Sequence, residues 1–106
     1  MVRARYTVDE NTHTLVLLGH ANYGEYGKDI VCAGVSALVQ ALIGWIEENS
    51  WKAECISVDH KECEMLISCE GGEDIAALFH MTAIGLEQIA DSYPDYVQID
   101  IIGIAD

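Results

Sequence analysis

The sequence predicts an α+β domain of two layers, in which two helices pack on one face of a mostly antiparallel sheet. Segments of alternating apolar and polar residues are typical of half-buried strands. Two longer segments repeat apolar residues at steps of three and four, as amphipathic helices do. With 106 residues and no linker or repeat, we expect one domain, residues 1–106, with elements in the order ββαββαβ.

The first two strands are predicted at residues 2–9 and 14–20. In "VRARYTVD" the apolar residues from Val2 to Val8 fall on one face, so this strand is half-buried. "TLVLLGH" has apolar residues on both faces, which favours an interior position in the sheet. It ends at His20, which we therefore expect at a strand end.

The two helices are predicted at residues 30–48 and 73–93. Asp29 precedes the first as the expected N-cap, because its carboxylate can accept a hydrogen bond from an early backbone N–H. Acidic residues open the second helix, and Pro94 follows its end. The expected inward residues are Val31, Val35, Leu38, Leu42 and Trp45 in the first helix, and Ile75, Leu78, Thr82 and Ile89 in the second.

Three more strands complete the sheet, at residues 52–59, 63–70 and 96–104. Their alternation places one set of apolar residues on a shared face of each of the last two strands. These sets are Cys63, Met65, Ile67 and Cys69, and Val97, Ile99 and Ile101.

The charge of the chain argues against nucleic acid as a direct partner. Eighteen acidic residues against five basic ones give a formal charge of −13, which repels a phosphate backbone. The acidity serves either solubility or the attraction of a basic partner.

We expect a cytoplasmic protein with no membrane partner. No window approaches the roughly 18–20 consecutive apolar residues of a spanning helix, and the N-terminus lacks the apolar stretch of a signal peptide. In the cytoplasm the four cysteines should be reduced thiols. They are Cys32, Cys55, Cys63 and Cys69.

A candidate catalytic pair flanks the loop in "GHANYGEYGKDIVC", residues 19–32. Cys32 falls near the third position of the first helix, where unpaired N–H groups and the macrodipole favour an anion such as a thiolate. His20 could accept the thiol proton and later protonate a leaving amine. Asp29 either caps the helix or orients His20, and Ser36 lies one turn after Cys32, as a hydrogen-bond donor or a small packing residue.

Other interpretations of these residues remain open. Buried inert cysteines and surface histidines are common, so the pair alone is a weak signal. His60, Cys63 and Cys69 could be imagined as zinc ligands, but no paired CxxC spacing supports a four-ligand site. A redox sensor is disfavoured because no resolving cysteine lies near Cys32 in sequence.

The segment "GHANYGEYGKDIVCAGVSAL", residues 19–38, resembles the signature of the Prp family of bacterial ribosomal-processing cysteine proteases. The shared features are a GHA motif, a short glycine-containing loop and a DIVCA-x-VSAL run. The resemblance implies a cytoplasmic, homodimeric thiol protease, and we expect no cofactor or metal. Its implied substrate is a basic large-subunit ribosomal protein, from which it removes a short N-terminal extension that ends in an aromatic-rich motif.

By this resemblance His20 corresponds to the catalytic histidine and Cys32 to the nucleophile. The expected reaction is attack of the Cys32 thiolate on the scissile carbonyl, with helix N–H groups holding the oxyanion. The alternatives are another cysteine-dependent hydrolase, or a non-catalytic module that binds or assembles a ribosomal protein. The remaining signature residues are Asp29 and Ser36, as supporting residues, and Gly24 and Gly27 in the mobile, substrate-binding loop.

Overall fold

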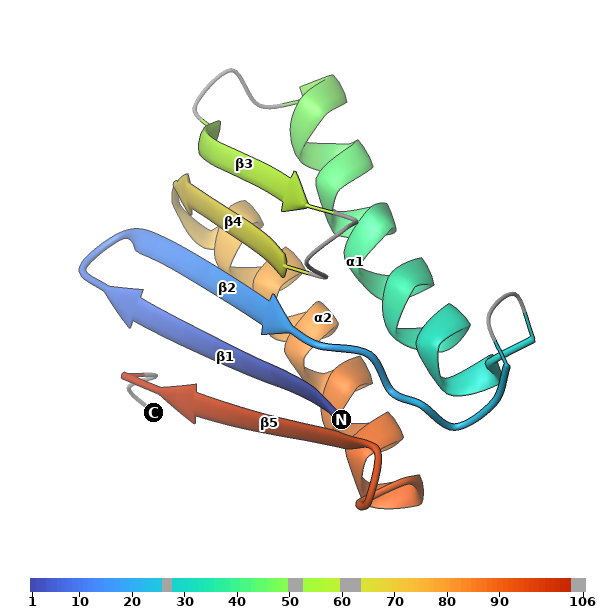
Figure 1. Ribbon diagram of the computed structural model, residues 1–106. Coiled ribbons are helices and arrows are strands. Elements are labelled where there is room, and N and C mark those ends of the chain that lie inside the picture. The colour runs from blue at the N-terminus through green and yellow to red at the C-terminus, as the bar shows by residue number, and fades with distance from the viewer. Residues whose placement is uncertain (26–27, 50–52, 60–63, 104–106) are drawn as a thin grey trace.

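The computed structural model describes residues 1–25, 28–49, 53–59 and 64–103 (Figure 1), with no account of the side chains of 53–59. It confirms the α+β class and the order ββαββαβ. The strands are β1 (Val2–Asp9), β2 (Thr12–Leu18), β3 (Ala53–Asp59), β4 (Glu64–Glu70) and β5 (Val97–Ile102), and the helices are α1 (Ile30–Asn49) and α2 (Glu73–Ser92).

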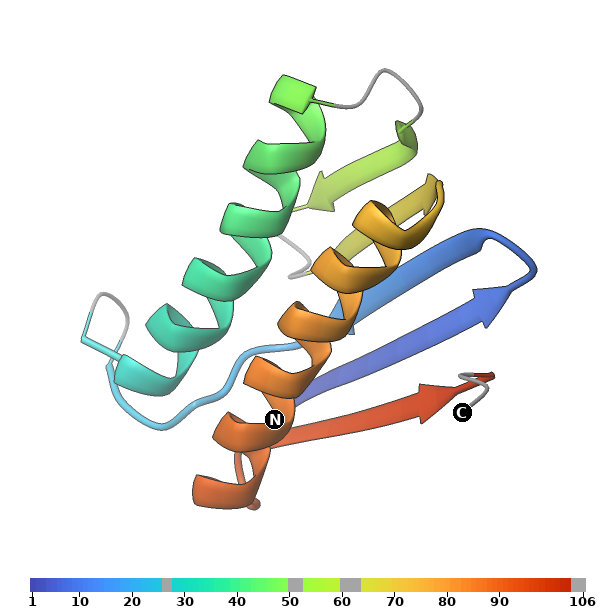
Figure 2. The ribbon, with the colours of Figure 1, turned by 180° about the vertical axis from the view of Figure 1, so that it is seen from behind.

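The five described strands form one sheet in the order β3-β4-β2-β1-β5. All neighbours are antiparallel except β1 and β5, which are parallel. The parallel pair arises because α2, which lies in the helical layer, carries the chain over the sheet from β4 to the opposite edge, where β5 begins (Figure 2). The predicted interior position of β2 is confirmed, since it lies between β4 and β1.

The second strand begins and ends two residues earlier than predicted. It starts at Thr12 because the turn is shorter than expected, with Glu10 in a left-handed conformation at φ 55°. It ends at Leu18 because Gly19 has a φ of 90°, which takes the chain out of the extended conformation. His20 therefore lies two residues beyond the end of β2.

Both helices cover the same face of the sheet, and the core lies between the two layers (Figures 1 and 2). The apolar stripes are close to those predicted but are centred on different residues, because packing decides which neighbouring position is fully buried. Leu38 and Trp45 in α1, and Leu78 and Ile89 in α2, are only partly buried. The fully buried residues are Val31, Val35, Val39, Leu42 and Ile46 in α1, and Ile75, Phe79, Thr82, Ala83 and Leu86 in α2.

A buried polar pair joins β1 to β2 inside this core. The Tyr6 hydroxyl lies 2.6 Å from His13 Nδ1. Burial raises the pKa of Tyr6 to about 12, while burial and the nearby His80 lower the pKa of His13. Tyr6 therefore stays protonated and donates its hydrogen bond to a neutral His13, which satisfies both groups without an internal charge.

Helix α1 is more apolar than the sequence windows indicated. By length and composition alone it could cross a membrane, because an 18-residue window within its 20 residues has a mean hydropathy of 1.8. In the structure one face of α1 packs into the core, and Ile30 at its start is 60% exposed.

Candidate active site

Asp29 caps the start of α1, as predicted. Its Oδ1 accepts a hydrogen bond from the Cys32 N–H at 2.9 Å, and its main-chain carbonyl accepts one from the Ala33 N–H at 3.0 Å. Cys32 is thus the third residue of the helix, at the position where the sequence placed it.

The same carboxylate fastens the preceding loop to the helix. Asp29 Oδ2 accepts hydrogen bonds from the N–H groups of Tyr23, at 2.9 Å, and Gly24, at 3.2 Å. A Cβ at Gly24 would lie 3.4 Å from the Lys28 carbonyl oxygen, so the two ends of the loop approach to about van der Waals contact. We name the arrangement of Asp29, Tyr23, Gly24 and Cys32 the Asp29 clasp.

The clasp keeps the Asp29 carboxylate ionised. Partial burial acts to raise its pKa, but the N–H groups of Cys32, Gly24, Tyr23 and Val31 outweigh this effect and lower the pKa below its usual 3.8. Of the two roles considered for Asp29, capping is shown by these hydrogen bonds. Orientation of His20 by Asp29 stays a prediction.

A cluster of three tyrosines, which the sequence analysis did not single out, holds the loop from the other side. The Tyr23 ring meets Tyr93 and Tyr96 edge to face, with centroids 5.2 and 5.1 Å apart. Tyr93 and Tyr96 belong to the short connection between α2 and β5. The run "YPDY" after the second helix was the available signal, since two aromatic residues in a turn need a surface to cover.

His20 lies at the same end of the molecule as the start of α1. A Cβ at Gly19 would lie 2.5 Å from the Met1 carbonyl oxygen, and the Val2 N–H donates to the Tyr96 carbonyl at 2.8 Å. The segment that leads from β2 to Tyr23 therefore runs close to the N-terminus, which is bound to the α2–β5 connection.

Three Cα steps of about 3.8 Å separate His20 from Tyr23, whose N–H is bound to the residue that caps α1. The structure thus brings the His20 and Cys32 segments together at one end. The His20 side chain is exposed and Cys32 is half-buried.

The other predicted residues have mixed outcomes. Ser36 is half-buried one turn after Cys32, and its role stays a prediction. Gly27, His60 and Cys63 lie outside the described residues, as does the Cys55 side chain. Cys69 is a buried core residue, as expected from its strand face.

The zinc alternative is untested, because it needs His60 and Cys63, which lie outside the described residues. The described side chains contain no group of three or more metal-binding residues.

The clasp restricts which backbone groups can hold an oxyanion. The Cys32 N–H donates to Asp29 Oδ1, and the Ala33 N–H donates to the Asp29 carbonyl. In this conformation neither amide is available to a substrate carbonyl. Oxyanion stabilisation at the helix start therefore requires other donors or a movement of Asp29.

A thiol at the capped start of a helix, joined through a short loop to a histidine that follows β2, is suited to a thiol-dependent hydrolase. Comparison with known proteins defines the class further, because residues 1–98 match the family model described as cysteine protease Prp. The chain belongs to the Prp family of cysteine proteases.

Individual relatives agree with this assignment. The ribosomal processing cysteine protease Prp of Staphylococcus aureus is 35% identical over 108 residues, covering 94% of this chain and 98% of that protein. The protein of the same name from Mycoplasma genitalium is 33% identical over 86 residues, covering 81% and 85%.

Solved structures share the fold. The essential ribosomal processing protease Prp from S. aureus, in complex with a covalently linked product peptide, superposes with a TM-score of 0.85 at 24% identity, covering 95% of this chain and 99% of that one. A protein from Streptococcus mutans superposes with a TM-score of 0.81 at 28% identity, covering 98% and 96%.

Proposed function

We propose that this cysteine protease removes a short N-terminal extension from a basic large-subunit ribosomal protein in the cytoplasm. The relatives are named as ribosomal processing proteases, and one of them was solved with a substrate peptide. The observation that carries the proposal here is the position of Cys32, half-buried at the third residue of a helix whose start is joined to the His20 segment.

In the proposed reaction the Cys32 thiolate attacks the scissile carbonyl carbon. His20 accepts the thiol proton and gives it to the leaving amine, so that the C–N bond breaks and an acyl-enzyme remains. Water activated by His20 then hydrolyses the thioester and regenerates the thiol. The positive end of the α1 macrodipole favours a thiolate at this position, while the negative charge of the nearby Asp29 carboxylate disfavours it.

The net charge supports a basic substrate. A formal charge of −13 attracts a polycation over distances comparable to the Debye length, about 8 Å at physiological ionic strength. The rate of encounter should therefore fall as salt rises.

The proposal is tested by mass spectrometry of the extended ribosomal protein before and after incubation with the enzyme. We expect a single N-terminal cut by the parent protein and none by Cys32→Ala or His20→Ala. Circular dichroism of each variant serves as the folding control. Cleavage by a folded Cys32→Ala protein would refute the assigned nucleophile.

We propose further that the protein pairs with a second copy through the outer face of the helical layer. This face carries Ile30 of α1, and Met81 and Ile84 of α2, which are 60%, 63% and 58% exposed. Small exposed residues of the same two helices permit close helix packing. These are Ala33, Ala37, Ala41 and Ala77.

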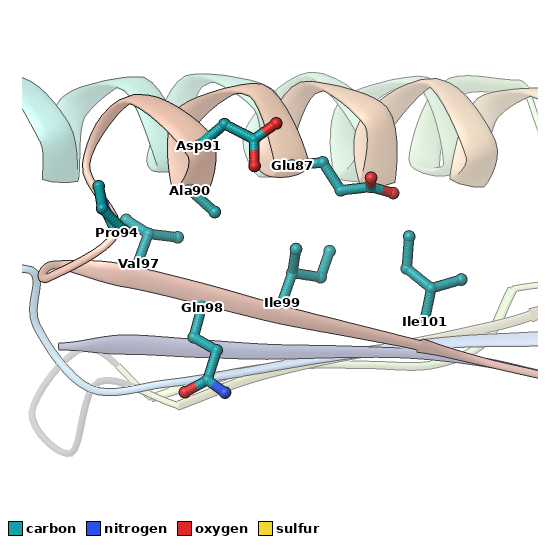
Figure 3. Close-up of a pocket in the computed structure, with 8 residues that line it drawn as sticks. All are labelled: Glu87, Ala90, Asp91, Pro94, Val97, Gln98, Ile99 and Ile101. Carbon is teal, nitrogen blue, oxygen red and sulfur yellow. The ribbon is translucent and has the colours of Figure 1, made fainter.

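Sedimentation at micromolar concentration tests the pairing. Met81→Glu should convert a dimer to a monomer, because it places a charge in an apolar contact. Gln98→Glu is the matched control, since it adds the same charge on the face of β5 turned away from the helices (Figure 3). A parent protein that sediments as a monomer would contradict the proposal.

A further inference from the structure

An open groove of about 600 Å³ lies between α2 and the edge strand β5 (Figure 3). Its floor is apolar and consists of Val97, Ile99 and Ile101, which project from β5 toward the helix. Its helical wall carries two carboxylates, Glu87 and Asp91. The residues described as lining the groove include no lysine or arginine, so no basic side chain of this lining neutralises the two carboxylates.

The groove begins at the end of the molecule that holds the candidate active site. Pro94 and Val97 line its first part. Pro94 lies in the same connection as Tyr93 and Tyr96, which pack on Tyr23 of the loop, and Val97 begins β5 directly after this connection. From there it follows β5 to Ile101. The start of the groove therefore lies next to the connection that contacts the loop before Cys32.

The spacing of the groove residues matches an extended peptide. Glu87 and Asp91 are four residues apart on a helix, so their Cβ atoms lie about 5–6 Å apart. Residues at alternate positions of an extended chain are about 6.6 Å apart on one face. Within the described part of the chain β5 is one of the two edge strands, so its free edge can also pair with the main chain of a peptide.

We infer that this groove binds a basic, extended segment of the substrate, with lysine or arginine at two alternate positions and apolar residues against Ile99 and Ile101. The inference rests on the proposed function. It places the segment on the C-terminal side of the cleaved bond, because the part of a basic ribosomal protein that is retained lies there. The groove would then select among substrates that share a cleavage sequence.

Two peptides test the inference. The short one spans only the cleaved bond, and the long one adds a C-terminal extension with two lysines at alternate positions among valines. The double variant Glu87→Gln/Asp91→Asn should lower the ratio of kcat/KM for the long peptide to that for the short peptide about fivefold, as expected for two exposed ion pairs. The matched control, Glu47→Gln/Glu48→Gln, changes the same charge at the far end of α1 and should leave this ratio as in the parent.

The inference would be overturned if the groove variant left the ratio of kcat/KM values unchanged. It would also be overturned if the groove variant converted a dimer to a monomer, because a second copy of the chain would then occupy the groove. Binding of the labelled lysine extension alone, followed by fluorescence anisotropy, separates this inference from the proposed function. Groove-dependent binding without cleavage of either peptide would support the groove and refute the protease assignment. Equal cleavage of both peptides would support the protease assignment and refute the inference about the groove.

Discussion

The Asp29 carboxylate accepts the Cys32 N–H at 2.9 Å with one oxygen and holds the loop amides of Tyr23 and Gly24 with the other. One side chain therefore begins the helix, positions the candidate nucleophile and closes the loop that joins it to the His20 segment. Because the carboxylate also occupies the Cys32 amide, access of a substrate carbonyl to that amide depends on the clasp.

Asp29→Ala should destabilise the fold by about 1 kcal/mol, because the helix loses its cap. Asp29→Asn should lower the free energy of unfolding by less, because the amide oxygen still accepts the Cys32 N–H. The hydrogen bonds from the loop amides are lost, since an NH2 group cannot accept them. Urea unfolding measures both changes. Glu48→Ala, at the other end of α1, serves as the control, and an Asp29→Ala protein as stable as the parent would contradict the clasp.

Cys32 should react with iodoacetamide near neutral pH faster than the other thiols of the chain. Cys69 is fully buried and should react only when the protein unfolds. In His20→Ala the rate at Cys32 should fall at least about tenfold, because the thiol loses its base. Peptide mapping after timed alkylation measures the rates, and equal rates in the parent and in His20→Ala would favour a binding module over an enzyme.

Gly19→Ala should destabilise the fold by about 2 kcal/mol or more. The residue has a φ of 90°, and a Cβ would lie 2.5 Å from the Met1 carbonyl oxygen. Thermal unfolding measures the loss. Gly44→Ala is the matched control, because a Cβ there meets no atom within 4 Å and alanine favours the helix. Equal effects of the two substitutions would contradict this role for Gly19.

Acid should weaken the fold through His13, whose pKa is lowered by burial and by His80 from its usual 6.5. The unfolded chain takes up a proton near that pH while the folded protein does not. The contribution of His13 to stability is therefore fully present above about pH 6.5 and is lost as the pH falls through the folded pKa. Urea unfolding at about pH 7.5 and about pH 5 should show a larger loss in the parent than in His13→Leu, and equal losses would contradict this origin.

Tyr23→Ala should release the loop while the fold persists. Edge-to-face pairs contribute about 1 kcal/mol each beyond their buried area, so local opening should rise about fivefold or more. Limited proteolysis near Tyr23 and Gly24 measures the opening. Tyr23→Phe keeps the ring and should resemble the parent, and a Tyr23→Ala protein with unchanged proteolysis would show that Tyr93 and Tyr96 do not hold the loop.

The sequence alone determined the class of the fold and the local position of the candidate nucleophile. Alternation in β1 and periodicity in α1 are imposed by the side-chain geometry of each element, and an aspartate followed by an apolar helix predicts its own cap. These features depend on neighbours a few residues apart, so Asp29 and the helical position of Cys32 were predictable.

Only the tertiary structure decided the parallel pairing of β1 with β5, the contact of Tyr23 with Tyr93 and Tyr96, and the groove between α2 and β5. Each joins segments far apart in the chain, and no local pattern specifies which of them meet. Packing also chose Val39 and Ile46 as fully buried residues of α1, because a stripe of apolar residues is wider than the contact that it makes with the sheet.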